Sequence, residues 1–305
     1  MAAQARFPEI EIAGKTCLVT GANTGIGRST ALGLAARGAS VVLACRNVPK
    51  AEAVAKDLRE TTGNKEIFVH PLDLSSVAAT RQSAERYLES GRPLDILINN
   101  AGLAGQRGLT TDGFELAFGT NHLGHFLFTL LVLDLLRASP GARVVVVASN
   151  NHRYPKAIDY QRVREPTRTV TGLREYGVSK LANVLFASEL SRRLAPDAVA
   201  TYSLNPGRIA SDIWKRVPWP IRPLFMRTMK TNEEGAQTSL MCACSRDLAT
   251  HSGRYYNQCV EETPSKAARD QALATELWTR SCEFVGMADP LPADRAQGSA
   301  TYDRS

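Results

Sequence analysis

Short apolar runs alternate with longer amphipathic stretches along most of the chain. The apolar runs have the length of strands and lie at 15–20, 40–46, 67–73, 94–100, 143–149 and 198–207. The stretches between them carry apolar residues at helical spacing and lie at 25–37, 50–63, 75–90, 112–137 and 177–194. Continuous apolar strands separated by helices are typical of a parallel sheet that is covered on both faces. The pattern therefore predicts a doubly wound α/β fold in a single domain.

Composition and polarity suggest where this domain begins and ends. The 305 residues are 44% hydrophobic and 22% charged, which suits one large α/β domain. We expect the folded domain to span residues 12–285, after a flexible N-terminus at 1–11. The segment 286–305 is mostly polar, and we expect it to be disordered.

Charge and cysteine content narrow the classes of function. The net charge of +7 suits attraction to a phosphate-bearing ligand or an anionic surface, although solubility alone also explains it. We expect no nucleic-acid partner. No pair of the six cysteines has the spacing of a zinc site, so we expect no metal and favour a reduced intracellular chain. Neither a signal peptide nor an 18-residue apolar run is visible, which makes the cytoplasm the expected location.

A glycine-rich loop, TGANTGIG at 20–27, follows the first strand and opens the first helix. Glycine lets the backbone turn sharply and approach a pyrophosphate, and the N-terminus of the helix then offers free N–H groups. A plain tight turn between strand and helix is the alternative. The loop predicts a Rossmann-type dinucleotide site, with contacts from Gly21, Asn23, Thr24, Gly25, Ile26 and Gly27.

The second strand ends in Arg46, and no acidic residue lies beside it in VVLACRN. In this fold the end of the second strand lies next to the adenosine ribose, where an acidic residue would favour NAD. An arginine there can instead pair with a 2′-phosphate through charge-assisted hydrogen bonds. We therefore expect NADP(H) as the cofactor, with an exposed arginine of no special role as the alternative. Arg28 is a candidate second cation.

Two further strand ends carry candidate cofactor contacts. Asp73 could accept a hydrogen bond from the adenine amino group, and Leu74 follows it with its backbone. The fourth strand ends in NNAG, where the small residues would let a cofactor lie flat on the strand ends. The contacts expected from this motif are Asn100, Ala101 and Gly102, whereas Asn99 has a structural interpretation as well.

Five motifs in order resemble the short-chain dehydrogenase/reductase family. They are the glycine loop at 20–27, NNAG at 99–102, a serine at the end of the strand 143–149, YxxxK at 176–180 and PG at 206–207. The resemblance covers about residues 12–285. Finer features resemble the retinol dehydrogenase branch of the family, among them LACR at 43–46, NHLGHF at 121–126, SKLANVLF at 179–186 and SGRYY at 252–256.

The resemblance implies a catalytic tetrad of Asn121, Ser149, Tyr176 and Lys180. A carbonyl reduction needs a hydride on carbon and a proton on oxygen, and Tyr176 is the expected general acid/base. Lys180 lies one helical turn further along, where its charge would lower the pKa of the phenol and its ammonium could hold the nicotinamide ribose. Ser149 would orient the substrate oxygen. Asn121 would break its helix and hold a water that relays protons to Lys180.

The family pattern also implies contacts after the last long strand. Pro206, Gly207 and Ile209 would border the nicotinamide, but Arg208 stands where the family often has threonine, and its charge has no explanation in the sequence. His152 is a candidate substrate contact, or else a plain loop histidine. The polar insertion at 150–172, between Ser149 and Tyr176, is expected to shape a wall of the substrate cleft.

A substrate lid is expected at about 208–232. Its segment 213–230 alternates apolar residues with lysine and arginine, which suits a lipophilic substrate mouth, a peripheral membrane contact or a lid packed on its own domain. We expect a lipophilic alcohol or carbonyl substrate, with the retinol/retinal pair first and steroids or lipid aldehydes next. A catalytically weak NADP(H)-binding regulator is the alternative from another class. The resemblance also suggests a homodimer formed through helices within 112–137 and 176–194.

Overall fold

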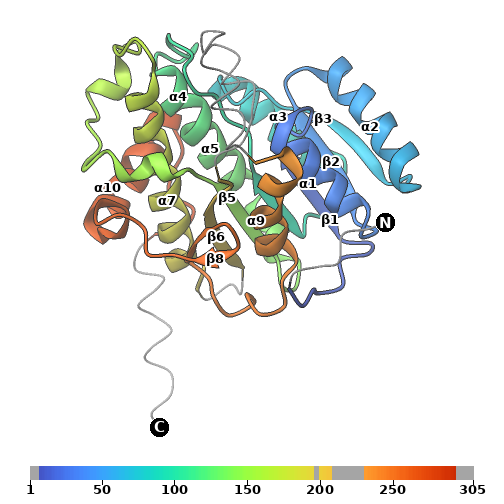
Figure 1. Ribbon diagram of the computed structural model, residues 1–305. Coiled ribbons are helices and arrows are strands. Elements are labelled where there is room, and N and C mark those ends of the chain that lie inside the picture. Colours follow the sequence, from blue (N-terminus) through green and yellow to red (C-terminus); the bar gives the residue numbers. More distant parts are fainter. Residues whose placement is uncertain (1–6, 196–198, 208–229, 293–305) are drawn as a thin grey trace, which may run out of the picture.

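An eight-stranded sheet runs through the centre of the molecule in the order β3-β2-β1-β4-β5-β6-β7-β8 (Figure 1). The computed structural model describes residues 7–195, 199–207 and 230–292. All neighbouring strands of this sheet pair in parallel except β7 and β8, which pair antiparallel. The strands are β1 Thr16–Thr20, β2 Ser40–Cys45, β3 Ile67–Pro71, β4 Ile96–Asn99, β5 Arg143–Val147, β6 Ala200–Asn205, β7 Tyr255–Asn257 and β8 Val260–Glu261.

Helices follow the strands and cover the sheet. The α-helices are α1 Gly25–Ala35, α2 Val48–Thr62, α3 Val77–Glu89, α4 Leu116–Phe118, α5 Gly124–Leu131, α6 Leu133–Arg137, α7 Leu173–Arg193, α9 Asn232–Cys244 and α10 Gln271–Val285. A π-helical turn, Gly119–Leu123, lies between α4 and α5. Short 3₁₀ turns lie at Asn150–Arg153, Arg162–Arg164 and Ala267–Arg269. The doubly wound Rossmann-type architecture expected from the sequence is confirmed.

The side chains of each central strand divide between two hydrophobic cores. Leu18 of β1 belongs to the core beneath α3, α5, α7 and α10, whereas its neighbours Cys17 and Val19 belong to the core beneath α1, α2 and α9. All three side chains are completely buried. Successive strand residues point to opposite faces, so a strand buried on both faces must be apolar throughout. This is why the strands appear in the sequence as unbroken apolar runs.

The last part of the domain was not visible in the hydrophobic pattern. The strands β7 and β8 are only three and two residues long. Helix α9 packs on α1 through mostly small buried residues (Figure 1). Its sequence therefore shows little difference in hydrophobicity between the buried and the exposed face. Helix α7 begins at Leu173 rather than at 177, directly after Gly172, which takes a left-handed conformation with φ of 63°.

The packed part of the chain extends beyond the expected limits of 12–285. At the N-terminal side, Glu9 pairs with Arg37 at 2.6 Å, and the N–H of Ile10 donates to the Cys244 carbonyl. At the C-terminal side, Leu291 is completely buried and its carbonyl accepts a hydrogen bond from Arg193. The expectation of disorder from residue 286 is therefore wrong for residues 286–292, and residues 293–305 lie outside the described chain.

Candidate active site

The glycine loop packs directly against the end of β4. Gly21 has φ of 66°, and a Cβ atom on it would lie 2.9 Å from the Ala101 Cα. A Cβ on Gly27 would lie 2.4 Å from the Asn100 Nδ2. That amide donates to the carbonyl of Thr20 at 2.7 Å and closes the contact between the two strand ends. Only glycine fits at these two places, so the loop can present its backbone closely to a bound phosphate.

Helix α1 begins within the loop, as the dinucleotide interpretation requires. Thr24 occupies its N-cap position in an extended conformation, and its side chain makes no capping hydrogen bond. Gly25 and Ile26 are its first two residues and are partly exposed, as is Asn23 before them. The first N–H groups of a helix have no partner inside the helix, so this end can receive an anion. The candidate second cation, Arg28, is instead paired with Asp57 of α2.

Arg46 follows the end of β2 and is exposed. Strand β2 lies beside β1, and the N–H of Gly21 donates to the Ala44 carbonyl at 2.8 Å, so Arg46 lies close to the glycine loop. Within the described residues, Arg46 has no ion pair or hydrogen bond. Its guanidinium is therefore available to an anionic ligand at the same edge of the sheet.

The two residues expected after β3 differ in what they leave available. Asp73 uses one carboxylate oxygen to accept hydrogen bonds from the N–H and the hydroxyl of Ser75 at 2.9 and 2.6 Å. Leu74 is buried, and a Cβ on Gly124 would lie 2.4 Å from its carbonyl oxygen. The turn after β3 is thus fixed against the start of α5. Asn99 is structural, because it is buried and its amide donates to Thr129.

Tyr176 and Lys180 lie on the same face of α7, beside the end of β5. The Lys180 Nζ donates to the Val147 carbonyl at 2.8 Å and lies 5.6 Å from the centre of the Tyr176 ring. It also borders NNAG, since a Cβ on Gly102 would lie 3.4 Å from it. Lys180 is buried and Tyr176 is partly exposed. The structure therefore brings the YxxxK pair, the end of β5 and NNAG to one place.

The pKa values of Tyr176 and Lys180 differ from those expected from the sequence. Burial raises the pKa of the Tyr176 phenol, and a hydrogen bond with the Ser149 hydroxyl opposes that rise. Burial lowers the pKa of Lys180 to about 7. The net shift of the Tyr176 pKa is therefore upward rather than downward, and the effect of Lys180 on the phenol stays a prediction. The phenol keeps its proton at neutral pH, as a general acid must.

Asn121 lies inside the π-helical turn, so the predicted break in its helix is present. Its side chain is buried and fully engaged: the Oδ1 accepts from the Leu103 N–H at 2.9 Å, and the Nδ2 donates to the Leu103 carbonyl and to the Ser179 hydroxyl. Ser179 in turn donates to the Tyr176 carbonyl at 2.8 Å. Asn121 thus joins the segment after NNAG to the first turns of α7. Sequence reasoning missed Ser179, although it stands beside the lysine in YGVSK.

The site holds Ser149 but not His152. Ser149 caps the 3₁₀ turn after β5 and lies close enough to Tyr176 to lower the pKa of its phenol. His152 is completely buried, its Nδ1 bonds to the Ser149 carbonyl at 2.7 Å, and its Nε2 accepts from the Ser265 N–H at 3.1 Å. With both ring nitrogens engaged by the backbone, His152 is not available to a substrate. The structure thus favours the loop histidine over the substrate contact, and its ring joins the backbone at Ser149 to that at Ser265.

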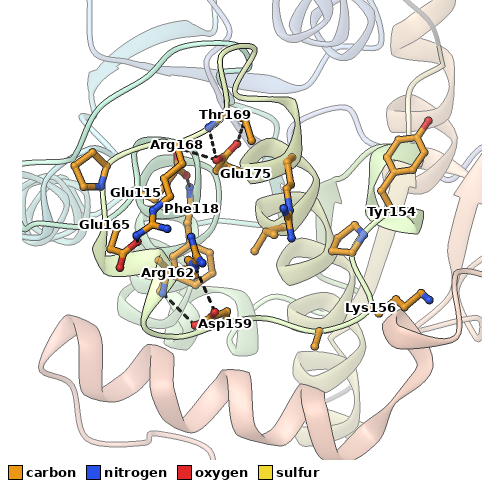
Figure 2. Close-up of a pocket in the computed structure, with 16 residues that line it drawn as sticks. Glu115, Phe118, Tyr154, Lys156, Asp159, Arg162, Glu165, Arg168, Thr169 and Glu175 are labelled. Atoms are coloured by element: carbon orange, nitrogen blue, oxygen red, sulfur yellow. Dashed lines mark hydrogen bonds and ion pairs between the residues drawn. The ribbon is translucent and has the colours of Figure 1, made fainter.

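The insertion at 150–172 lines most of a cavity of about 830 Å³ (Figure 2). Figure 2 shows Arg168 turned toward Glu165 and Glu175 toward Thr169. From α7 the cavity is lined by Arg174, Glu175 and Val178, whereas Tyr176 and Ser149 do not line it. Residues 174 and 178 lie roughly opposite 176 and 180 on a helix of 3.6 residues per turn. The cavity is therefore beside the Tyr176–Lys180 pair rather than around it.

Several expectations fall near or on residues outside the described chain. Pro206 and Gly207 follow β6 and are partly exposed, but Ile209 and the role of Arg208 lie outside. So does nearly all of the lid and of the segment 213–230; residues 231 and 232 cap and begin α9. Along the described part of the chain, no helix is long and apolar enough to cross a membrane.

Helix α10 packs on part of the helices through which a homodimer is predicted. Trp278 of α10 is buried with its ring 5.1 Å from that of Phe126 and 6.1 Å from that of Phe186 of α7. Ser281 bonds to His122 in the π-helical turn at 2.9 Å. This part of α5 and α7 is therefore buried within a single chain.

Comparisons with known proteins agree with this geometry. The family model described as short chain dehydrogenase matches residues 15–161. The chain is 43% identical over 284 residues to retinol dehydrogenase 12 of Mus musculus, covering 91% of this chain and 88% of that protein. It is 45% identical over 300 residues to dehydrogenase/reductase SDR family member 13 of Homo sapiens, covering 95% and 78%. A solved structure of an uncharacterised protein from Mycobacterium Paratuberculosis superposes with a TM-score of 0.73 at 31% identity, covering 94% of this chain and 98% of that one.

Proposed function

The chain belongs to the short-chain dehydrogenase/reductase family, and we propose that it is an NADP(H)-dependent oxidoreductase that interconverts a lipophilic alcohol and its aldehyde or ketone. The observation that carries this proposal is the joining of Ser149, Tyr176 and Lys180 at the edge of the sheet that also holds the glycine loop. In open α/β sheets, ligands bind at the carboxyl ends of the strands, where the strand order reverses. Here β1 lies between β2 and β4, which is such a place.

The residues at this edge fit a dinucleotide. Gly21 and Gly27 leave room only for backbone, and the N-terminus of α1 opens from the loop. When bound, the cofactor supplies the hydride. Arg46 supports NADP(H), because an exposed guanidinium without a partner among the described residues can form charge-assisted hydrogen bonds with a 2′-phosphate. An acidic residue, which would favour NAD, is absent from the end of β2.

Side chains of the protein can supply the proton that the substrate oxygen needs. Because burial raises the pKa of Tyr176, its hydroxyl is protonated at neutral pH and can donate to a developing alkoxide. Ser149 lies beside this phenol, and its hydroxyl can donate to the same substrate oxygen, which would hold the carbonyl at Tyr176. Lys180 is held by the Val147 carbonyl next to the phenol.

Retinal is the first substrate to test. The names of relatives that are 41–45% identical over about nine-tenths of the chain support it, since most of them are retinol dehydrogenases. Lipid aldehydes and ketosteroids share its character, a carbonyl on an apolar body. The described part of the chain does not include the expected lid, so the choice among these substrates rests on the relatives.

Initial rates of NADPH and NADH oxidation with all-trans-retinal, a medium-chain aldehyde and a ketosteroid would test the proposal. Wild type should turn over at least one of them, faster with NADPH. Tyr176→Phe should lose at least about a thousandfold in kcat, because the proton donor is removed, while NADPH binding persists. Tyr154→Phe is the matched control, because Tyr154 is 78% exposed on the insertion. NADPH binding without turnover of any carbonyl would instead indicate a regulatory protein.

A further inference from the structure

We infer that His125 is a positioning residue of this site, and that one neutral tautomer of its imidazole ties the end of β1 to the main chain of Asn121. His125 lies in α5 and is 1% exposed. Its Nε2 lies 2.8 Å from the Thr20 hydroxyl, and its Nδ1 lies 3.0 Å from the Asn121 carbonyl oxygen. The kinetic part of this inference rests on the proposed function, but its structural part does not.

The protons in this chain of hydrogen bonds can be assigned from their partners. The Thr20 hydroxyl oxygen accepts from the N–H groups of Asn100 and Ala101, each at 2.9 Å, and this uses both of its lone pairs. Its own proton must therefore be donated, and the His125 Nε2 at 2.8 Å is a nearer acceptor than the Ile98 carbonyl at 3.4 Å. The Asn121 carbonyl can only accept, so the His125 Nδ1 carries the ring proton.

A protonated imidazole would not fit this arrangement. Its Nε2–H would face a hydroxyl oxygen whose lone pairs are already occupied. The electrostatic surroundings also favour the neutral ring. Burial lowers the pKa of His125 to about 4, and the positive charge of Lys180 nearby lowers it further. The other titratable group close by is His122, which is buried in the preceding turn. His125 thus stays neutral wherever the protein is active near neutral pH, and it is not a proton carrier.

Thr20 and Asn121, which His125 connects, each hold a different part of the site. Through the two N–H groups, Thr20 fixes the NNAG segment on which Gly21 and Gly27 pack. Asn121 fixes the segment at Leu103 and, through Ser179, the main chain of Tyr176. His125 adds a direct link between Thr20, at the start of the cofactor loop, and Asn121, which is joined to the helix of the acid/base pair. A buried network of this kind specifies one arrangement only while all its members are satisfied.

The π-helical turn explains why such a link is needed. A π-helical turn interrupts the regular series of hydrogen bonds and is often found at functional sites. Asn121 lies in this turn, and its carbonyl accepts from a side chain four residues further on. The position of Asn121 is therefore set by His125 as well as by the helix. A shift of about 1 Å at a site of this type can cost about a hundredfold in rate.

The decisive variant is His125→Phe, which keeps an aromatic ring but removes both nitrogens. We expect kcat to fall about 10- to 100-fold and the Kd for the nicotinamide dinucleotide to rise several-fold, both measured where the protein is fully folded. The control is His122→Phe. His122 is equally buried but bonds to Ser281 of α10, away from the cofactor edge, so kcat and Kd should stay within about twofold. His125→Gln, which can keep one of the two hydrogen bonds, should recover part of the lost kcat.

A second measurement tests the tautomer assigned to His125 and does not depend on enzyme turnover. Long-range ¹H–¹⁵N spectra of the wild type should show His125 with the proton on Nδ1 and should not change between pH 6 and 8, whereas an Nε2–H tautomer or a titrating ring would overturn the inference. So would a His125→Phe enzyme with unchanged kcat and Kd. If the wild type reduces no carbonyl, the proposed function fails, and the tautomer and the dinucleotide Kd still decide the role of His125.

Discussion

Acid should destabilise this protein through two buried histidines, His122 and His125. Burial lowers the pKa of His122 to about 3 and that of His125 to about 4, whereas an unperturbed imidazole titrates near 6.5. In both cases the folded-state pKa lies below the unfolded one. Such a group contributes its full stability above pH 6.5 and loses it as the pH falls toward its folded-state pKa, because the unfolded chain takes up the proton first.

The loss in the free energy of unfolding follows from the gap between the folded-state and unfolded-state pKa values. Each pH unit below 6.5 costs about 1.4 kcal/mol per histidine while the folded ring stays neutral, so at pH 5 the two together cost about 4 kcal/mol. Burial also lowers the pKa of His70 and His152, which adds to the effect. Carboxyl groups with lowered pKa, such as that of Asp95, begin from an ordinary value of 3.8 and act mainly at lower pH. Two other groups also titrate between pH 7 and 5. Lys180, with a folded-state pKa of about 7, adds less than about 1 kcal/mol to the loss, and Glu115, whose pKa is raised by burial, acts in the opposite direction. The histidines therefore dominate this range.

Urea unfolding at pH 7 and pH 5 measures the effect. The free energy of unfolding of the wild type should fall by about 4 kcal/mol or more, and His122→Phe should lose about 2 kcal/mol less over the same range because one titrating group is gone. His251→Asn removes an exposed histidine and should lose as much as the wild type. The reasoning is refuted if the wild type loses less than about 1 kcal/mol or if His122→Phe loses as much as the wild type.

Three substitutions test other parts of the structure. Gly27→Ala places a Cβ 2.4 Å from the Asn100 Nδ2 and should weaken dinucleotide binding at least about tenfold in a fluorescence titration; unchanged affinity would mean that the loop does not pack as described. Arg46→Gln should raise the Kd for NADPH about tenfold and leave that for NADH unchanged, whereas equal effects on both would contradict a 2′-phosphate contact. Trp278→Ala empties the contact of α10 with Phe126 and Phe186 and should cost about 3–5 kcal/mol in urea unfolding. A cost below about 1 kcal/mol would show that α10 is only loosely held.

Local patterns in the sequence were enough for the sheet and for the positions of the main site residues. A strand buried on both faces must be apolar throughout, so the six long strands could be recognised from their composition. The glycines at 21 and 27 follow a strand and open a helix, which is a local relation. Tyr176 and Lys180 share a face because residues four apart on any helix do.

Contacts between distant segments decided the rest. Nothing near His125 in the sequence shows that its ring meets Thr20, which is 105 residues earlier, because sheet topology alone brings them together. The sequence left His152 open between a cleft contact and a loop histidine, and only the structure shows that backbone groups of residues 149 and 265 bond to both of its ring nitrogens. The pKa values of Tyr176 and Lys180 depend on how much protein surrounds them, and burial makes the net shift of the phenol pKa upward rather than downward. Sequence spacing determines which side chains share an element, whereas desolvation and hydrogen-bond partners are set only when separate elements pack together.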